Sequence, residues 1–290
     1  MEYLLHILIL ISIYTILAVS LDLLAGQTGL LSVAHAAFYG LGAYTSALLA
    51  IKFGIPFYVG ILAGMAVAAL ASFIVSLSAL RLHDDYFVIA TFGFQVIVSS
   101  LLDNWIEVTN GPLGIAAIPR PSVFGWPIRS DVGFVILTSL CAFFAYFVVY
   151  RISTSPFGRV LRAIREDEVS AQTFGRNTLR FKATVFAVST SLAALAGSLY
   201  AHYVTYIDPT IFTVTESILV ISILIFGGAD SKWGPLVGAV VLITLPEALR
   251  FIGLPNSVAA NLRQMLYGAL LIVMLMLRPR GLMGCYVFGK

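Results

Sequence analysis

The stretch "YLLHILILISIYTILAVSLDLLAGQTGLLSVAHAAFYGLGAYTSALLA" at residues 3–50 decides the fold class. It places two apolar runs, at 3–21 and 34–51, on either side of a short polar segment rich in glycine. A helix needs about 20 predominantly apolar residues to cross the hydrocarbon core of a bilayer, and each run approaches that length. The stretch therefore predicts two membrane-spanning helices, joined by backbone that interrupts the helical pattern.

The rest of the chain repeats this pattern. Of its 290 residues 60% are hydrophobic and 11% are charged, whereas an ordinary soluble domain has about 25% charged residues. Further apolar runs lie at 56–80, 86–103, 132–150, 183–203, 217–229, 235–252 and 264–278. We expect one all-α polytopic membrane domain over residues 1–290, a bundle of about 8–10 transmembrane helices. The run at 217–229 is short and ends in Gly227 and Gly228, which favours a broken or re-entrant helix.

The charges predict the orientation in the membrane. The formal net charge is only +3, which does not indicate a nucleic-acid partner. The loop at 151–182 carries seven of the seventeen basic residues, so the positive-inside rule predicts that it is cytoplasmic. Counting crossings outward from it places the N-terminus outside, the C-terminus inside and the loop at 104–131 on the extracytoplasmic side. The run at 3–21 lacks a basic segment before it and a clear cleavage site after it, so we expect a retained helix.

The sequence shows no catalytic apparatus. The patterns G-x-x-x-x-G-K-[ST], H-E-x-x-H and G-x-S-x-G do not occur in it. Cys141 and Cys285 have the spacing of neither a disulfide framework nor a metal site. We therefore expect no enzyme activity, no bound cofactor and no metal in this chain. If its work consumes ATP, another subunit must hydrolyse it.

The polar segment between the first two runs is the first candidate site. Its candidate residues are Gly26, Gln27, Thr28, Gly29, Ser32 and His35. Irregular backbone at membrane depth needs a cover of protein or water, because each unpaired N–H or C=O costs several kcal/mol in hydrocarbon. Two interpretations stay open from spacing alone: a break beside a solute pathway, or a short turn outside the membrane. For His35 a proton-relay or ligand role stands beside a structural role as a neutral imidazole bonded to a backbone carbonyl.

Small residues recur at helical spacing in three of the runs. The stripes are Ala36, Gly40, Ala43, Ala47 and Ala50; Gly60, Gly64, Ala68 and Ser72; and Ser189, Ala193, Gly197 and Ala201. Such stripes let helix backbones approach closely in a bilayer, where lipid tails are as apolar as leucine. They predict a compact helix bundle.

The segment at 153–183 is the second candidate site. Pro156 can start a helix there, with Val160, Leu161 and Ile164 on an apolar side, and Gly175 can end it. The charged residues on the other side predict an amphipathic helix lying on the cytoplasmic face. It could rest on anionic lipid or dock into a groove of a cytosolic partner.

Several motifs together resemble one family. They are "GQTGLLSVAHAAFYGLGAYTSALL" at 26–49, "DYFVIATFGFQ" at 85–95, "TNGPLGI" at 109–115, "FGRVLRAIREDEVSAQTFGRNTLRFKATVFAVSTSLAALAGSLYAHY" at 157–203 and "FGGADSKWGPLVGAVVLITLPEALR" at 226–250. In this order, over nearly the whole chain, they are similar to the M-type permease subunit of branched-chain amino-acid ABC importers.

The resemblance implies a multi-pass subunit of the cell (inner) membrane, paired with a homologous H-type permease. Two cytoplasmic ATPase subunits would use ATP, and an extracytoplasmic solute-binding protein would deliver leucine, isoleucine or valine. It implies a coupling helix that seats in the ATPase, for which we expect Phe157, Gly158, Arg162, Ala163, Arg165 and Glu166. It implies that the stretch at 26–35 lines or braces the passage. For the translocation pathway we expect Gly26, Gln27, Thr28, Gly29, Ser32, His35, Gly227 and Gly228.

Two alternatives remain at this stage. Related importers for urea share these motifs, so urea, short amides and other amino acids stay open as cargo. A transporter of another class would be driven by a proton or sodium gradient through an ionisable residue inside the membrane, with Asp22, His35, Glu216 or Glu247 as candidates.

Overall fold

The computed structural model describes residues 2–79, 84–123, 126–128, 130–250 and scattered residues between 265 and 284. Within this part, six helices are long and apolar enough to cross a membrane. They are α1 (Glu2–Thr28), α2 (His35–Phe53), α3 (Phe57–Ala79), α4 (Asp84–Asn104), α6 (Asp131–Thr154) and α9 (Thr178–Val204). Two shorter apolar helices follow, α10 (Val214–Gly227) and α11 (Gly234–Arg250). The expected all-α polytopic membrane fold is confirmed. The expected span at 264–278 is described in part, and its described residues between 265 and 276 are helical.

Short elements close the two ends of the bundle. The helices are α5 (Ile106–Thr109), η1 (Gly111–Leu113), α7 (Pro156–Glu166), α8 (Glu168–Thr173) and η2 (Pro209–Phe212). The strands are β1 (Ile115–Ala116), β2 (Ser122–Val123), β3 (Trp126–Pro127) and β4 (Tyr206–Ile207). They form two antiparallel pairs, β1 with β4 and β2 with β3.

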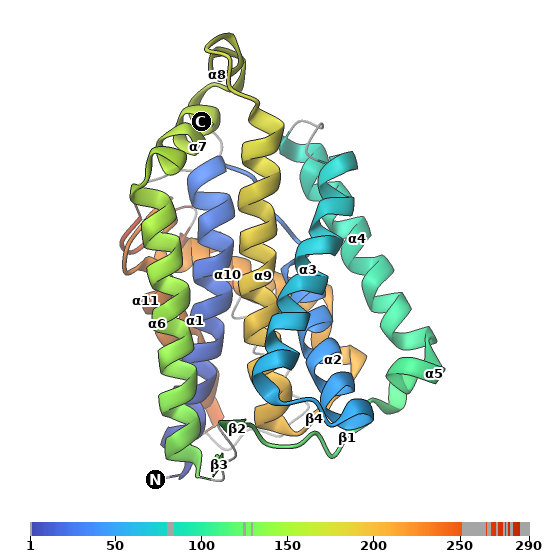
Figure 1. The fold of residues 1–290 in the computed structure, drawn as a ribbon. Helices are drawn as coiled ribbons and strands as arrows, with labels where there is room; N and C mark the ends of the chain where they lie inside the picture. Colours follow the sequence, from blue (N-terminus) through green and yellow to red (C-terminus); the bar gives the residue numbers. More distant parts are fainter. Residues whose placement is uncertain are drawn as a thin grey trace.

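The strands and the start of α1 lie at one end of the bundle, and α7 and α8 lie at the other (Figure 1). We call these the strand end and the α7 end. The loop that contains α7 and α8 is the one that the positive-inside rule assigns to the cytoplasm. The α7 end is therefore the predicted cytoplasmic end.

Close backbone contacts hold the centre of the bundle together. A Cβ atom at Gly197 of α9 would overlap the carbonyl of Tyr39 in α2, and one at Gly42 would overlap the carbonyl of Ala194. Gly197 belongs to a predicted small-residue stripe, whereas Gly42 does not, and Gly40 from the α2 stripe faces Phe212 instead. Small residues therefore allow close helix packing as expected, here between α2 and α9, although the α2 residue in closest contact, Gly42, is not in the predicted stripe.

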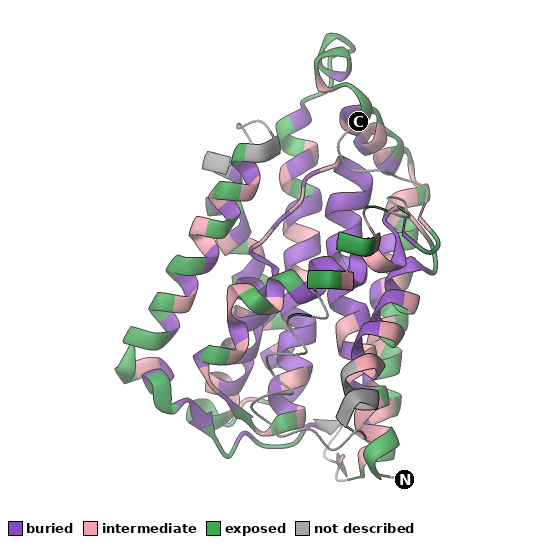
Figure 2. Ribbon diagram, turned by 180° about the vertical axis from the view of Figure 1, so that it is seen from behind, coloured by how far each residue is buried: buried purple, intermediate pink, exposed green. Residues whose placement is uncertain are grey.

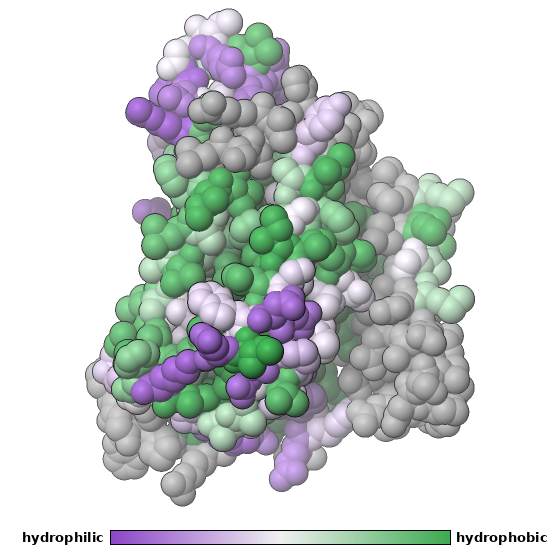
Figure 3. Space-filling view, turned by 90° about the vertical axis from the view of Figure 1, so that its right-hand side faces the viewer, coloured by the Kyte–Doolittle hydropathy of each residue, from purple (hydrophilic) through white to green (hydrophobic). Residues whose placement is uncertain are grey.

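The burial pattern is the one that a lipid environment produces. Buried residues line the inner helices, and exposed residues follow the outer sides of the bundle (Figure 2). Many of the exposed side chains are large and apolar, among them Leu62, Leu70, Phe73, Ile89, Ile97, Phe143, Phe144 and Phe147. Hydrophobic side chains cover the middle of the face in Figure 3, and hydrophilic ones gather at the top and in a lower patch. Apolar surface of this extent on α3, α4 and α6 suits contact with lipid tails or another membrane helix.

Candidate functional site

Irregular backbone between the first two helices is confined to residues 29–34. Helix α1 continues through Gly26, Gln27 and Thr28, so the expectation of a break from Gly26 onward is wrong for these three residues. Gly26 allows a close approach instead, because a Cβ atom there would collide with Asp22 and with the backbone of Asp230. The helix ends at Gly29, whose φ of +77° lies in the left-handed region that glycine adopts without strain.

The break lies within the bundle rather than outside it. Nε2 of His35, at the start of α2, lies 3.3 Å from Oγ of Ser189, and this hydroxyl also donates to the carbonyl of Ser20. Ser20 precedes Thr28 by eight residues, which corresponds to about 12 Å along an α-helix. The chain therefore turns back from the end of α1 into the bundle before α2 begins. The alternative of a short turn outside the membrane does not fit this depth.

Side chains of other helices satisfy the backbone at the break. Three N–H groups donate to them: Val33 to Thr91 Oγ1 (3.2 Å), Ala36 to Ser217 Oγ (3.0 Å) and Ala37 to Gln95 Oε1 (2.6 Å). The amide of Gln95 also donates to the carbonyl of Phe212 at 2.8 Å, just before α10. Helices α4 and α10 thus supply the hydrogen bonds that the first turn of α2 cannot make for itself. All of these partners are neutral.

The predicted pathway residues Ser32 and His35 are both fully buried at this break. Oγ of Ser32 accepts a hydrogen bond from the N–H of Ala34 at 3.3 Å. His35 contacts the Ser189 hydroxyl rather than the expected backbone carbonyl, and its Nδ1 has no partner among the described residues. These contacts indicate that Ser32 and His35 stabilise the irregular backbone of the break within the subunit.

The other pathway glycines lie elsewhere, at the α7 end. Gly227 packs against the backbone of Gly234, where a Cβ atom would not fit, and Gly228 has a φ of +102°. Together they permit the tight turn at 228–233 between α10 and α11. Asp230 in this turn has a φ of +57°, which is uncommon for a residue other than glycine. Its N–H donates to Oδ1 of Asp22 at 2.8 Å, which fixes the turn against α1.

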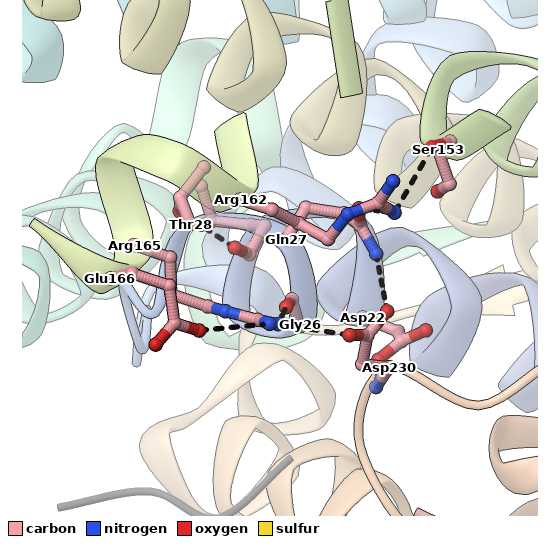
Figure 4. A network of polar contacts seen from close by, with 10 residues as sticks. Asp22, Gly26, Gln27, Thr28, Ser153, Arg162, Arg165, Glu166 and Asp230 are labelled. Atoms are coloured by element: carbon pink, nitrogen blue, oxygen red, sulfur yellow. Dashed lines mark hydrogen bonds and ion pairs between the residues drawn. The ribbon is translucent and has the colours of Figure 1, made fainter. Parts of the chain in front are cut away.

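Asp230 is the centre of a polar network that joins the two predicted sites (Figure 4). Arg165 of α7 forms an ion pair with Asp230 at 3.0 Å and donates to the carbonyl of Gly26. The side-chain amide of Gln27 donates to Asp230 Oδ1 at 2.7 Å. Arg162 donates to Gln27 Oε1 at 3.3 Å and to the carbonyl of Ser153 at 3.1 Å. We call Gly26, Gln27, Arg162, Arg165 and Asp230 the Asp230 network.

Helix α7 is amphipathic and starts as expected, with Pro156 in its first turn and Ser155 as its N-cap. It ends at Glu166 rather than continuing to Gly175. The carboxylate of Asp167 accepts a hydrogen bond from the N–H of Ser170 at 3.0 Å and so caps a separate helix, α8. This backbone hydrogen bond lowers the pKa of Asp167.

The six predicted coupling residues divide between two sides of α7. Phe157 stacks on Phe181 of α9, Gly158 is buried, and Arg162 and Arg165 point into the Asp230 network. Only Ala163 and Glu166 are exposed. Beyond them Val169 and Phe174 of the α8 region are 71% and 84% exposed. The arginines thus fasten α7 to the bundle instead of facing outward.

The sequence reasoning missed Gln95 and Asp230, which hold the two irregular segments. Gln95 is a fully buried amide in an otherwise apolar run, and polar side chains in membrane spans commonly bond across helices. Asp230 stands between two short apolar runs, where a carboxylate indicates the end of a membrane-spanning segment. A buried amide within an apolar run and a carboxylate between two runs could therefore both have been identified from the sequence.

Comparisons with known proteins identify the family. A family model described as the permease component of the branched-chain amino acid transport system matches residues 3–275. The chain belongs to this permease family. The high-affinity branched-chain amino acid transport permease LivM of Salmonella typhimurium is 35% identical over 93% of this chain and 68% of that protein. LivH of the same organism is 25% identical over 94% of this chain and 92% of its own length.

The permease also has a counterpart among solved structures. PsaBC from Streptococcus pneumoniae, in complex with Fab, matches 97% of this chain and 93% of its own with a TM-score of 0.51 and 15% identity. At that identity the match shows a shared fold alone. The chain is a multi-pass membrane protein and a transporter component, not an enzyme by itself.

Proposed function

We propose that this permease forms, with a homologous H-type permease, the translocation pathway of an ATP-driven importer for leucine, isoleucine and valine. An extracytoplasmic binding protein delivers the amino acid, and two cytoplasmic ATPase subunits use ATP. The complex lies in the cell inner membrane, with the C-terminus of this chain in the cytoplasm. The observation that carries the proposal is the 35% identity to LivM over 93% of the chain.

In this function the break at residues 29–34 braces the pathway. Ser32 and His35 are fully buried inside the subunit, so they support the wall rather than contact the cargo. The first turn of α2 depends on Ser217 of α10 for one hydrogen bond, and the turn after α10 belongs to the Asp230 network. Ser217 lies ten residues before Gly227, the last residue of α10, which corresponds to about 15 Å along the helix between these two points. A displacement of α7 can therefore reach the break through α10.

The surface that meets the ATPase is the outward side of α7 and α8. It comprises Arg159, Ala163, Glu166, Val169 and Phe174, all of which are exposed. Arg162 and Arg165 act behind this surface by holding α7 on α1 and on the turn at 228–233. Gly158 serves the corner between α6 and α7, because a Cβ atom there would lie 2.5 Å from the carbonyl oxygens of Ile152 and Ser153.

The test is uptake by the complete complex in liposomes with ATP on the ATPase side. Labelled leucine should accumulate only when ATP and the binding protein are both present, and Phe174→Asp should abolish uptake while the complex still assembles. Uptake by this chain alone, driven by a proton or sodium gradient, would instead support a secondary transporter. Urea or a short amide binding to the binding protein in preference to leucine would change the cargo and keep the transporter class.

A further inference from the structure

A cavity of about 200 Å³ opens at the α7 end, between α1, α6, α7 and the turn at 228–233. It adjoins the Asp230 network on the side of α6. The charged side chains that line it are Asp22, Asp230, Arg162 and Lys232, and the rings of Tyr146 and Tyr150 form part of its wall.

Apart from Asp230, none of these charged groups forms an ion pair with a described residue. Asp22 is only 7% exposed, and the one hydrogen bond to its carboxylate comes from a backbone N–H, that of Asp230. The guanidinium of Arg162 donates to neutral oxygens alone, and the ammonium of Lys232 lies 5.5 Å from the centre of the Tyr150 ring.

The neighbouring pair of Arg165 and Asp230, by contrast, is in direct contact at 3.0 Å. Asp22 is mostly buried and Arg162 is half-buried, whereas Lys232 is exposed. A buried charged group normally finds a counter-charge, because removing an ion from water costs free energy that an opposite charge must offset. The buried carboxylate of Asp22, with Arg162 and Lys232 at the same cavity and no ion pair between them, matches a ligand that carries both charges.

We propose that this cavity binds a small zwitterion with a primary ammonium and an anionic oxygen group. The ammonium lies against the carboxylate of Asp22, and the anionic oxygens lie toward Arg162 and Lys232. Two sources have this chemistry, the head group of phosphatidylethanolamine and a free amino acid in the cytoplasm. Only the amino-acid source rests on the proposed function; the lipid source does not depend on what the permease carries.

The surroundings of the cavity are those of a membrane interface. Helix α6 exposes Phe143, Phe144 and Phe147, which provide apolar surface for acyl chains. Trp233 is 60% exposed and stacks on Tyr146 with ring centres 6.1 Å apart. Tryptophan and tyrosine gather at the level of lipid head groups, where an apolar ring and a polar edge both find suitable contacts. A lipid head group can therefore enter the cavity while its tails lie on α6.

The experiment is native mass spectrometry of the purified complete importer without its binding protein. One arm titrates phosphatidylethanolamine against phosphatidylglycerol, which lacks the ammonium. A second arm titrates L-leucine against 4-methylpentanoate, which lacks the amine, and 3-methylbutylamine, which lacks the carboxylate. Asp22→Asn keeps an oxygen to accept from the Asp230 N–H and removes the charge, while Lys232→Gln removes one cation. The matched control is Lys52→Gln, which changes an exposed lysine in the last turn of α2, a helix that does not line the cavity.

We expect one zwitterion to bind more tightly than its single-charge analogues, and Asp22→Asn and Lys232→Gln each to weaken it about tenfold, the effect of losing one charged contact. Lys52→Gln should leave the affinity unchanged. Preference for phosphatidylethanolamine assigns the lipid source, and preference for leucine assigns the amino acid. Equal binding of phosphatidylglycerol, or zwitterion binding that survives both cavity variants, would overturn the proposal. If the complete importer binds phosphatidylethanolamine as expected but shows no ATP-driven uptake of leucine in liposomes, that result would count against the proposed function alone.

Discussion

The break at residues 29–34 and the turn at 228–233 solve the same problem with different chemistry. In both, the backbone leaves the helical form and side chains from distant elements hold it. At the break the partners are neutral, as with Gln95 and Ser217. At the turn they are charged, with Asp230 paired to Arg165 of α7.

Depth in the bundle explains the difference. The break reaches about 12 Å inward from the end of α1, where a charged side chain would lose its water. The turn lies at the α7 end beside an open cavity, so its charges keep part of their hydration. Neutral hydrogen bonds suit any depth, whereas an ion pair is tolerated best near the end of the bundle.

Replacing Gln95 by leucine should have the largest effect. It leaves the Ala37 N–H without its acceptor at a buried position, and it removes one of the two donors to the Phe212 carbonyl, which keeps the Ser99 hydroxyl at 3.2 Å. We expect a loss of about 2 kcal/mol in the free energy of unfolding and a clear fall in Tm of the purified complex. Gln172→Leu on the exposed α8 is the control and should change Tm little. An unchanged Tm for Gln95→Leu would show that the break does not need its neutral partners.

Asp230→Asn tests the charged region and should rank second. It removes the ion pair with Arg165 but keeps an acceptor for Gln27. Arg165, whose side chain is 9% exposed, then keeps only the exposed carboxylate of Glu166, at 3.3 Å, among its ion-pair partners in the described residues. We expect about 1.5 kcal/mol of destabilisation and faster tryptic cleavage at Arg159, because α7 loosens. Adding Arg165→Gln should restore part of the stability. If the double variant is as unstable as the sum of the single ones, the pair does not act as a pair.

Ser217→Ala should have a smaller effect, about 1 kcal/mol. It removes the acceptor of the Ala36 N–H and a long hydrogen bond, 3.4 Å, that the hydroxyl donates to Gln95 Oε1, which keeps the Ala37 N–H. Ser222→Ala on the same helix is the control, because its hydroxyl bonds only to the carbonyl of Ile218 within α10. Thermal unfolding of the two variants in the same detergent compares them directly. Equal Tm values for the two variants would show that the Ser217 hydroxyl does not stabilise the break.

Salt should separate the two regions. Raising NaCl to 1 M shortens the screening length to about 3 Å, which weakens partly hydrated ion pairs but not neutral hydrogen bonds. The Tm penalty of Asp230→Asn should therefore shrink modestly in high salt, while that of Gln95→Leu stays constant. A salt-dependent penalty for Gln95→Leu would contradict the distinction between the two regions.

The smallest effect concerns Asp167, a carboxylate fully in water at the tip of the same loop. Its folded pKa is lowered by the hydrogen bond from the Ser170 N–H. Its contribution is complete above the unfolded pKa of about 4 and disappears as the pH falls through the lower folded value. A spin label at Gln172 should become more mobile between pH 5 and pH 3, and Asp167→Asn should abolish that change.

The sequence by itself determined the membrane class, most of the spans and the family. These follow from local properties, namely run length, hydropathy and motif order, that act on each segment separately. The start of α7 at Pro156 and the stripes of small residues were predictable for the same reason, whereas the pairing of α2 with α9 was not. The helix boundary at Thr28 and the division of α7 from α8 were not, although each is short-range in sequence.

Only the tertiary structure decided how the polar residues are used. The N–H of Ala36 finds its acceptor 181 positions along the chain, at Ser217, and Arg165 meets Asp230 from a different element. The helical pattern predicts that Arg162 and Arg165 lie on the exposed charged side of α7. They face the bundle instead, because their hydrogen-bond acceptors lie there: the carboxylate of Asp230 and the carbonyl groups of Gly26 and Ser153. A buried polar group must be satisfied wherever its partner is, and that place is set by packing rather than by neighbours in sequence.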